Sequence, residues 1–440
     1  MKGKRIFFIG VAILYLHPSS IFAQGVQRDL DFWRPPDQRG VNAFEPGKKN
    51  KDSITFDGVR VRVGGAFALQ FQGLSHSNES IPVFSDPNDP SFNANELVAI
   101  GNNFNLATAN LDLDAALAPG VRLHLRTYLS SRHHVETYVK GGYLQIDRLD
   151  FIKEGMWSDL MDMVSVRIGH MEINYGDQHF RRTDNGQALL NPFAGNYIMD
   201  AFTTEMAAEF YVFKNDIMLM GGLSNGRLNQ SVTNLGSKPA LLLKAAYDKQ
   251  QTADFRFRLS GSMYAVLGET SNVQLYGGDR AGSRYYFVTE NTRSSVSGNF
   301  TSGRINPALR NKMVSAMFNA FIKYQGWELF ATYELANGEN TAADSDKRNW
   351  NQIAADLIFR FGGREQLYVG ARINNASGEL TGTTTDVSAT RFAGVFGWFM
   401  TPNIMTKLEI VDQSYSDYAM NSILHEANFN GVMLEAVIAF

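Results

Sequence analysis

Apolar and polar side chains alternate along most of this chain with a period of two residues. In residues 59–73, "VRVRVGGAFALQFQG", Val61 and Phe67 belong to an apolar set, and Arg60 and Arg62 belong to the polar set between them. Successive side chains of a β-strand point to opposite faces of the sheet. The pattern therefore predicts a strand with one apolar and one polar face.

The same alternation returns in sixteen segments, which predicts a protein built from β-strands. Several segments are longer than the strands of ordinary soluble sheets, and they suit strands that cross a membrane at a tilt. The predicted strands are 59–73, 103–117, 121–131, 136–149, 162–170, 203–213, 216–224, 240–247, 254–265, 312–324, 327–337, 350–361, 366–374, 389–399, 404–413 and 428–440.

The connections between these segments alternate in length. Tight turns are predicted at "APG" (118–120), "KN" (214–215), "QG" (325–326), "GGRE" (362–365) and "TPN" (401–403). Long polar loops lie between them, and this alternation is typical of outer-membrane barrels. Two connections depart from the rule, because 131–136 is short for an external loop and "DFIKEGMWSDLM" (150–161) is long for an internal turn.

The alternation reaches the last residue, Phe440, in "NFNGVMLEAVIAF". In lipid every backbone amide and carbonyl must be paired, so a sheet that crosses a membrane has to close on itself. A last strand that pairs with the first satisfies this requirement. We therefore predict an all-β fold for residues 58–440: a 16-stranded antiparallel transmembrane β-barrel with short periplasmic turns and long extracellular loops.

The first 57 residues show no such alternation. Lys2, Lys4 and Arg5 precede an apolar run that ends near Leu16, and Ala23 is a plausible cleavage point. The run is too short to span a bilayer as a helix, so residues 1–23 are interpreted as a secretory signal peptide. Residues 24–57 are polar and rich in proline, which predicts a periplasmic leader or a small plug.

Composition narrows the class of protein further. The chain has no cysteine, so an exported protein of this sequence is stabilised by packing and hydrogen bonds rather than by disulfides. No basic block or nucleic-acid motif is present, and we expect no nucleic-acid partner. The expected location is the cell outer membrane, with outer-membrane lipid and lipopolysaccharide as neighbours.

The polar faces of the predicted strands carry many charges, and cations outnumber acids among them. A dry barrel core would not hold so many ions, so the pattern favours a water-filled channel for small hydrophilic solutes with a weak anion preference. Pairing across neighbouring strands is an equally valid interpretation of the same residues. The candidate pore-lining residues are Arg60, Arg62, Asp112, Asp114, Arg122, Arg126, Arg167, Arg256, Arg258, Glu328, Arg360 and Arg372.

Two stretches resemble porins of the phosphate-selective type: "VRIGHMEINYGDQHF" (166–180) and "MLMGGLSNG" (218–226). His170, Glu172 and Asn174 stand where that type usually carries Gln, Lys and Pro, so the resemblance implies a porin-like barrel rather than phosphate selectivity. It also implies a homotrimer and a third external loop, 171–202, that folds inward. An external flap is the alternative for this loop. The expected constriction residues are Arg181, Arg182 and Asp184.

Other functions have weaker support in the sequence. "GLSNG" (222–226) matches the G-x-S-x-G elbow of hydrolases, but Ser224 would lie on a strand without the following helix that such an elbow needs. His133 and His134 are neighbours and would face opposite sides of a strand, so no metal or cofactor is expected. A partner-binding barrel remains a further alternative, and loop 266–311 is expected to be a solvated external loop with several arginines.

Overall fold

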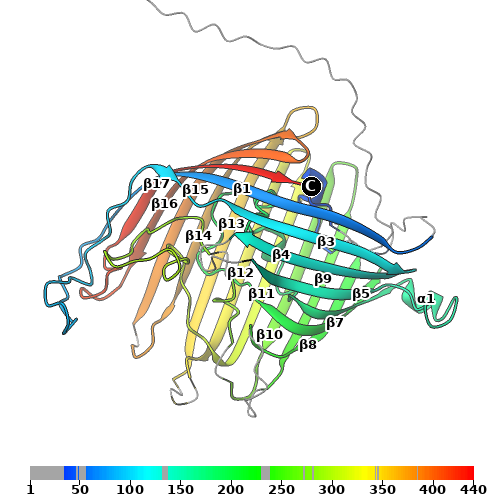
Figure 1. Ribbon diagram of the computed structural model, residues 1–440, viewed down its shortest axis with the longest axis horizontal. Helices are drawn as coiled ribbons and strands as arrows, with labels where there is room; N and C mark the ends of the chain where they lie inside the picture. Colours follow the sequence, from blue (N-terminus) through cyan, green and yellow to red (C-terminus); the bar gives the residue numbers. More distant parts are fainter. Residues whose placement is uncertain are drawn as a thin grey trace, which may run out of the picture.

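The computed structural model describes residues 34–45, 48, 56–130, 137–228, 238–270, 273–279, 282–341, 343, 346–383 and 385–440. Their strands form one antiparallel sheet that closes into a barrel (Figure 1). The first strand pairs with the last, so the blue β1 and the red β17 lie side by side. The predicted signal peptide, residues 24–33 and the histidines at 133 and 134 lie outside the described residues.

Sixteen long strands make the ring in the part of the chain that the structure describes, which confirms the predicted fold class. The segment 103–117, predicted as one strand, is divided in the structure into the two-residue strand β2 and the long strand β3. Both pair with β1, and β2 lies outside the count of the sixteen long strands. The strands are β1 (Arg60–Ser77), β2 (Asn103–Phe104), β3 (Thr108–Ala118), β4 (Val121–Ser130), β5 (Tyr138–Ile146), β6 (Val164–Glu172), β7 (Thr204–Lys214), β8 (Ile217–Ser224), β9 (Ala240–Gln250), β10 (Phe255–Ala265), β11 (Asn311–Tyr324), β12 (Trp327–Glu339), β13 (Arg348–Phe361), β14 (Leu367–Glu379), β15 (Asp386–Thr401), β16 (Ile404–Ser416) and β17 (Asn428–Ala439).

Burial follows the period of two along each long strand. In β12, Trp327 and Tyr333 are 50% and 43% exposed on the outer wall, whereas Glu328 and Glu334 are buried inside. The outer wall is thus apolar and the inner wall is charged, the reverse of a soluble barrel. A continuous apolar exterior of this size needs an apolar surrounding, which a bilayer provides.

Tight turns join the strands at one end of the barrel, as predicted. Between β7 and β8, Asn215 and Asp216 both have positive φ angles, 49° and 66°, which a two-residue hairpin with matching twist requires. The exception at this end is the long connection from β5 to β6, which contains the short helix α1 (Ser158–Met161). None of the described helices has the length and hydropathy needed to cross a membrane.

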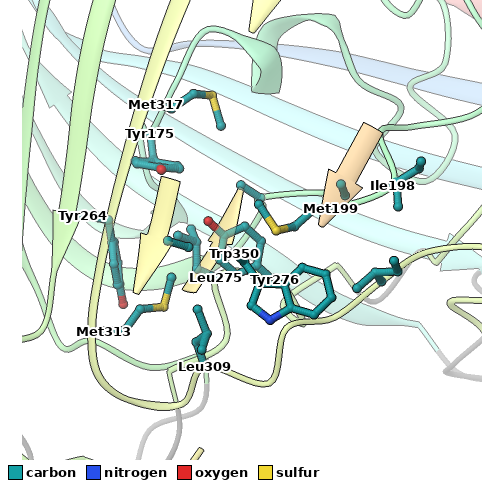
Figure 2. Packing of buried hydrophobic residues seen from close by; sticks show 14 of the residues in the cluster. Tyr175, Ile198, Met199, Tyr264, Leu275, Tyr276, Leu309, Met313, Met317 and Trp350 are labelled. Atoms are coloured by element: carbon teal, nitrogen blue, oxygen red, sulfur yellow. The ribbon is translucent and has the colours of Figure 1, made fainter. Parts of the chain in front are cut away.

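Two long connections fold into the barrel and fill much of it. The inner loop, residues 173–203, is buried almost throughout. Loop 266–310 packs beside it, and Tyr175, Met199 and Tyr276 meet Met313 and Trp350 of the strands in one apolar cluster (Figure 2).

The expectation of a solvated 266–311 loop is therefore wrong for its described central part. Arg284 is buried and binds Glu435 at 3.1 Å, and only Arg293 is well exposed among the paired arginines that the structure describes in this loop. The loop turns inward because Val273, Leu275 and Tyr285 add apolar area that leaves water when the loop packs in the barrel.

Candidate functional site

The inner loop rests on the wall formed by β12 to β17. Its backbone amides at Ala194, Ile198 and Met199 donate to side chains of that wall: Glu409 at 2.8 Å, Asn374 at 2.6 Å and Gln352 at 2.9 Å. A buried loop has to satisfy its backbone groups, and here the strand side chains do so.

Cations of the same wall bind the carbonyl oxygens of the inner loop. The ammonium of Lys407 donates to the carbonyls of Ala188, Asn191 and Phe193 at 2.9 to 3.0 Å. Arg372 donates to the carbonyl of Gly195 at 2.8 Å. Both the backbone amides and the backbone carbonyls of the inner loop are therefore hydrogen-bonded to side chains of this wall.

The three expected constriction residues point in different directions. Arg181 lies 3.8 Å from Glu328 and 3.9 Å from Asp356, on the side of β12 and β13. Arg182 binds Asp200 within the inner loop at 2.7 Å and Asp279 of loop 266–310 at 2.5 Å. It thereby ties the two inward loops together.

Asp184 reaches across the barrel interior to β4. It lies 3.4 Å from Arg126 and accepts a hydrogen bond from the Tyr128 hydroxyl. Burial raises the pKa of Asp184 to about 8, because Arg126 only partly offsets the loss of water. By contrast, the pKa of Asp200 falls to about 2, since the nearby Arg182 and Arg304 outweigh the effect of its burial.

A cavity of about 230 Å³ lies between the inner loop and the opposite wall. That wall consists of β3 to β6 and presents Asp112, Asp114, Arg122, Arg126, Lys140 and Arg167 to the cavity. The other side is formed by the inner loop, with Asp184 and His179, and by residues 34–36 and 44.

Neighbouring strands pair many of these charges. Arg126 binds Asp112 through two hydrogen bonds of 2.8 Å, and His124 lies 3.0 Å from Asp114. Arg122 donates to the amide oxygen of Gln145 at 3.0 Å. Cross-strand pairing is thus present within the cavity wall.

The remaining candidate pore-lining residues lie elsewhere. Arg60 is exposed at the start of β1 and binds Asp57 at 2.7 Å, and Arg62 is half-buried on the same strand. The others sit beneath the inner loop or the leader in ion pairs: Arg256 with Asp248, Arg258 with Asp177 and Glu45, Arg360 with Glu328, and Arg372 with Asp356.

Three residues with side chains inside the barrel, Lys140, Asn42 and Glu45, are absent from the candidates predicted from the sequence. Lys140 reaches the cavity because the β4–β5 register shifts at Arg126, which moves it to the inner face. Asn42 and Glu45 of the leader bind residues inside the barrel. The leader shows no period, so only its mixture of Phe44 with polar residues distinguishes this part from a solvated linker.

Ser224 does not show the surroundings of a hydrolase nucleophile. Its hydroxyl donates to the carboxylate of Glu205, and the amide of Gly226 donates to the hydroxyl at 3.2 Å. Its partner is thus an acid rather than the histidine that general-base catalysis in this motif needs.

No protein-family model matches the sequence, and no curated protein matches it. Among solved structures, the anion-selective porin from Comamonas acidovorans is similar over 87% of this chain and 100% of its own, with 10% identity and a TM-score of 0.51. The outer membrane channel DcaP of Acinetobacter baumannii is similar over 88% of this chain and 99% of its own, with 11% identity and a TM-score of 0.51. The chain therefore has the fold of outer-membrane porins.

Proposed function

We propose that this protein is a passive outer-membrane channel for small hydrophilic solutes. The observation that carries the proposal is the charged cavity inside a closed barrel whose outer wall is apolar. An apolar exterior holds the barrel in lipid, and a charged interior holds water and hydrated solutes. Passage needs no chemical step, so pore width and wall charge set the selectivity.

The proposed route runs between the inner loop and β3 to β6. The opposite wall is sealed by the loop, whereas this side keeps open space. Arg181, Arg182 and Asp184 act in this proposal as constriction residues in different ways: Arg181 holds the loop in place, Asp184 reaches the cavity, and Arg182 does both.

A weak anion preference is part of the proposal. Among the residues around the cavity, arginine and lysine outnumber aspartate and glutamate. The raised pKa of Asp184, about 8, keeps that carboxyl largely neutral at pH 7 and strengthens the excess. Wall charges lie within a Debye length of a passing ion, about 8 Å at physiological salt, so they are only partly screened.

Recordings from the purified protein in planar lipid bilayers test this function. We expect stepwise conductance, and a reversal potential in a potassium chloride gradient that indicates a modest preference for chloride. Phosphate belongs among the anions tested, because residues 166–180 resemble the phosphate-selective type. The channel is refuted if neither the correctly folded, inserted protein nor its variant without residues 34–45 conducts.

We also propose a homotrimer, on the resemblance to porins. The apolar outer wall offers area for both lipid and a second copy. Chemical crosslinking in native outer membranes, followed by denaturing electrophoresis, should yield a species of three chains. A monomer alone at saturating crosslinker would contradict the trimer.

A further inference from the structure

Residues 34–45 and Lys48, here called the strap, cross the barrel at the end where the tight turns lie. The amide of Gln38 donates to the carbonyl of Pro402 at 2.8 Å, and its side chain donates to the carbonyl of Arg364 at 3.0 Å. These are the turns after β15 and β13. Lys48 donates to the carbonyls of Asp147 and Met161 at 3.0 and 2.7 Å, in the connection from β5 to β6. The strap is therefore fastened on opposite sides of the ring.

Charged contacts hold the middle of the strap. The carboxylate of Glu45 lies 2.8 Å from the ammonium of Lys244 and 2.5 Å from the guanidinium of Arg258, with all three side chains buried. Asn174 of the inner loop donates to the same carboxylate at 2.8 Å. Burial alone would raise the pKa of Glu45, but Arg258 and Lys244 outweigh it and lower the pKa to about 2. The carboxylate thus stays ionised at physiological pH.

An aromatic anchor lies next to this charge. Phe44 is 2% exposed, and its ring centroid lies 5.4 Å from that of Phe321 and 5.8 Å from that of Phe180. Its neighbour Asn42 donates to Glu328 at 2.7 Å. Phe180 belongs to the inner loop and Phe321 to β11, so the anchor joins the strap to both.

The strap also forms part of the cavity. Arg34, Pro35, Pro36 and Phe44 are among the residues that surround it. The same segment that crosses the mouth of the barrel thus takes up space beside the proposed route.

We propose that the strap is an autoinhibitory element that narrows the channel, and that Glu45 is the latch that keeps it in place. This inference rests on the proposed channel function. Without the Glu45 carboxylate, Lys244 and Arg258 share Asp177, and Arg258 also keeps Asp248 at 3.3 Å. The same buried cations then face one acid fewer, and a buried ion pair that loses one partner is strongly destabilised. The strap is then held only by its other contacts, it leaves the cavity more often, and the passage widens.

Three variants of the full chain test the strap in planar bilayers. Deletion of residues 34–45 should raise single-channel conductance several-fold. Glu45→Gln keeps the shape of the side chain and removes its charge. The channel should then spend more time in the high-conductance state, the one that the deletion variant shows. Glu79→Gln is the matched control, because Glu79 is exposed in the connection after β1 at the other end of the barrel. It should behave as the unmodified protein.

A reversible test avoids variants that fail to fold. The chain has no cysteine, so the double variant Gln38→Cys with Arg364→Cys offers a single reactive pair. A cleavable thiol crosslinker should suppress the higher conductance in this protein, and reduction should restore it in the same bilayer.

The outcomes separate the two proposals. If the unmodified protein conducts and neither the deletion nor Glu45→Gln changes its conductance, the strap inference fails and the channel stands. If the unmodified protein is silent and the deletion conducts, both are supported. If no folded variant conducts, both are refuted.

Discussion

Two carboxylate–guanidinium pairs with nearly the same geometry lie on opposite walls of the barrel. Arg126 binds Asp112 across β3 and β4 with two bonds of 2.8 Å, and Arg372 binds Asp356 across β13 and β14 with bonds of 2.6 and 2.8 Å. The Arg126 and Asp112 side chains are 23% and 14% exposed beside the cavity. Those of Arg372 and Asp356 are 3% and 0% exposed beneath the inner loop.

The two pairs differ in solvent exposure because the inner loop covers only one of them; their positions on the strands are equivalent. Alternation places all four side chains on the inner face, and neighbouring register lets each acid meet its arginine. The inner loop then covers one pair, and its Gly195 carbonyl accepts a hydrogen bond from Arg372. The covered pair is removed from water and helps to hold the inner loop on the wall, whereas the other pair keeps contact with the cavity, where it acts on passing ions in the proposed channel.

The largest expected change is in conductance, when the inner loop is shortened and no longer covers the wall formed by β12 to β17. Deletion of residues 181–190 removes Arg182, and with it the ties to Asp200 and Asp279. We expect single-channel conductance to rise several-fold, because the loop no longer fills the barrel. Deletion of 417–426, a segment of the same length in the connection between β16 and β17, is the control and should leave conductance near its original value. Equal conductance in both folded variants would show that the inner loop does not narrow the route.

The two acids should differ in their effect on stability. Asp356→Ala leaves Arg372 buried with one carbonyl partner, and we expect the free energy of unfolding to fall by about 3–5 kcal/mol. Asp112→Ala leaves Arg126 near water and near Asp184, and we expect a loss of about 1 kcal/mol or less. Urea unfolding in lipid vesicles, followed by tryptophan fluorescence, measures both. Similar losses would contradict the distinction between covered and open walls.

Ion selectivity should depend more on the open wall beside the cavity than on the covered wall, the reverse of the order expected for stability. Replacing Arg122 and Arg126 with glutamine removes two charges beside the cavity, so the reversal potential should move toward cation selectivity, most clearly at low salt. Replacing Arg360 and Arg372 removes the same charge from the covered wall, and the shift should be small. An equal shift from both double variants would place the route on both sides of the loop.

The smallest expected effect concerns pH. The Asp184 carboxyl is protonated below its pKa of about 8 and ionised above it, so its negative charge appears in the cavity as the pH rises. We therefore expect the anion preference to weaken between about pH 7 and 9. The Asp184→Asn variant should lack this step. A step that persists in the variant would have to come from another group.

The sequence predicts the barrel well because strands and turns have local signatures. Alternation depends only on neighbouring residues, and positive φ at Asn215 and Asp216 belongs to a local turn. Loop placement depends on distant partners instead. Arg284 reaches Glu435 and Glu45 reaches Arg258, and no period in the sequence connects such positions. The expected solvated loop is an error of this kind, and the contacts of the leader inside the barrel lack a sequence signal for the same reason.

The seam between β1 and β17 has a consequence for the order of folding. Gln70 donates to Glu435 at 2.6 Å across 365 positions of the chain, and Gly431 lets β17 approach the carbonyl of Gly73 more closely than any side chain allows. Contacts this remote carry a high loop-closure entropy and form slowly. Because the strap and both inward loops lie inside the finished ring, we expect them to be enclosed as the seam closes, which makes seam closure the rate-limiting step of refolding.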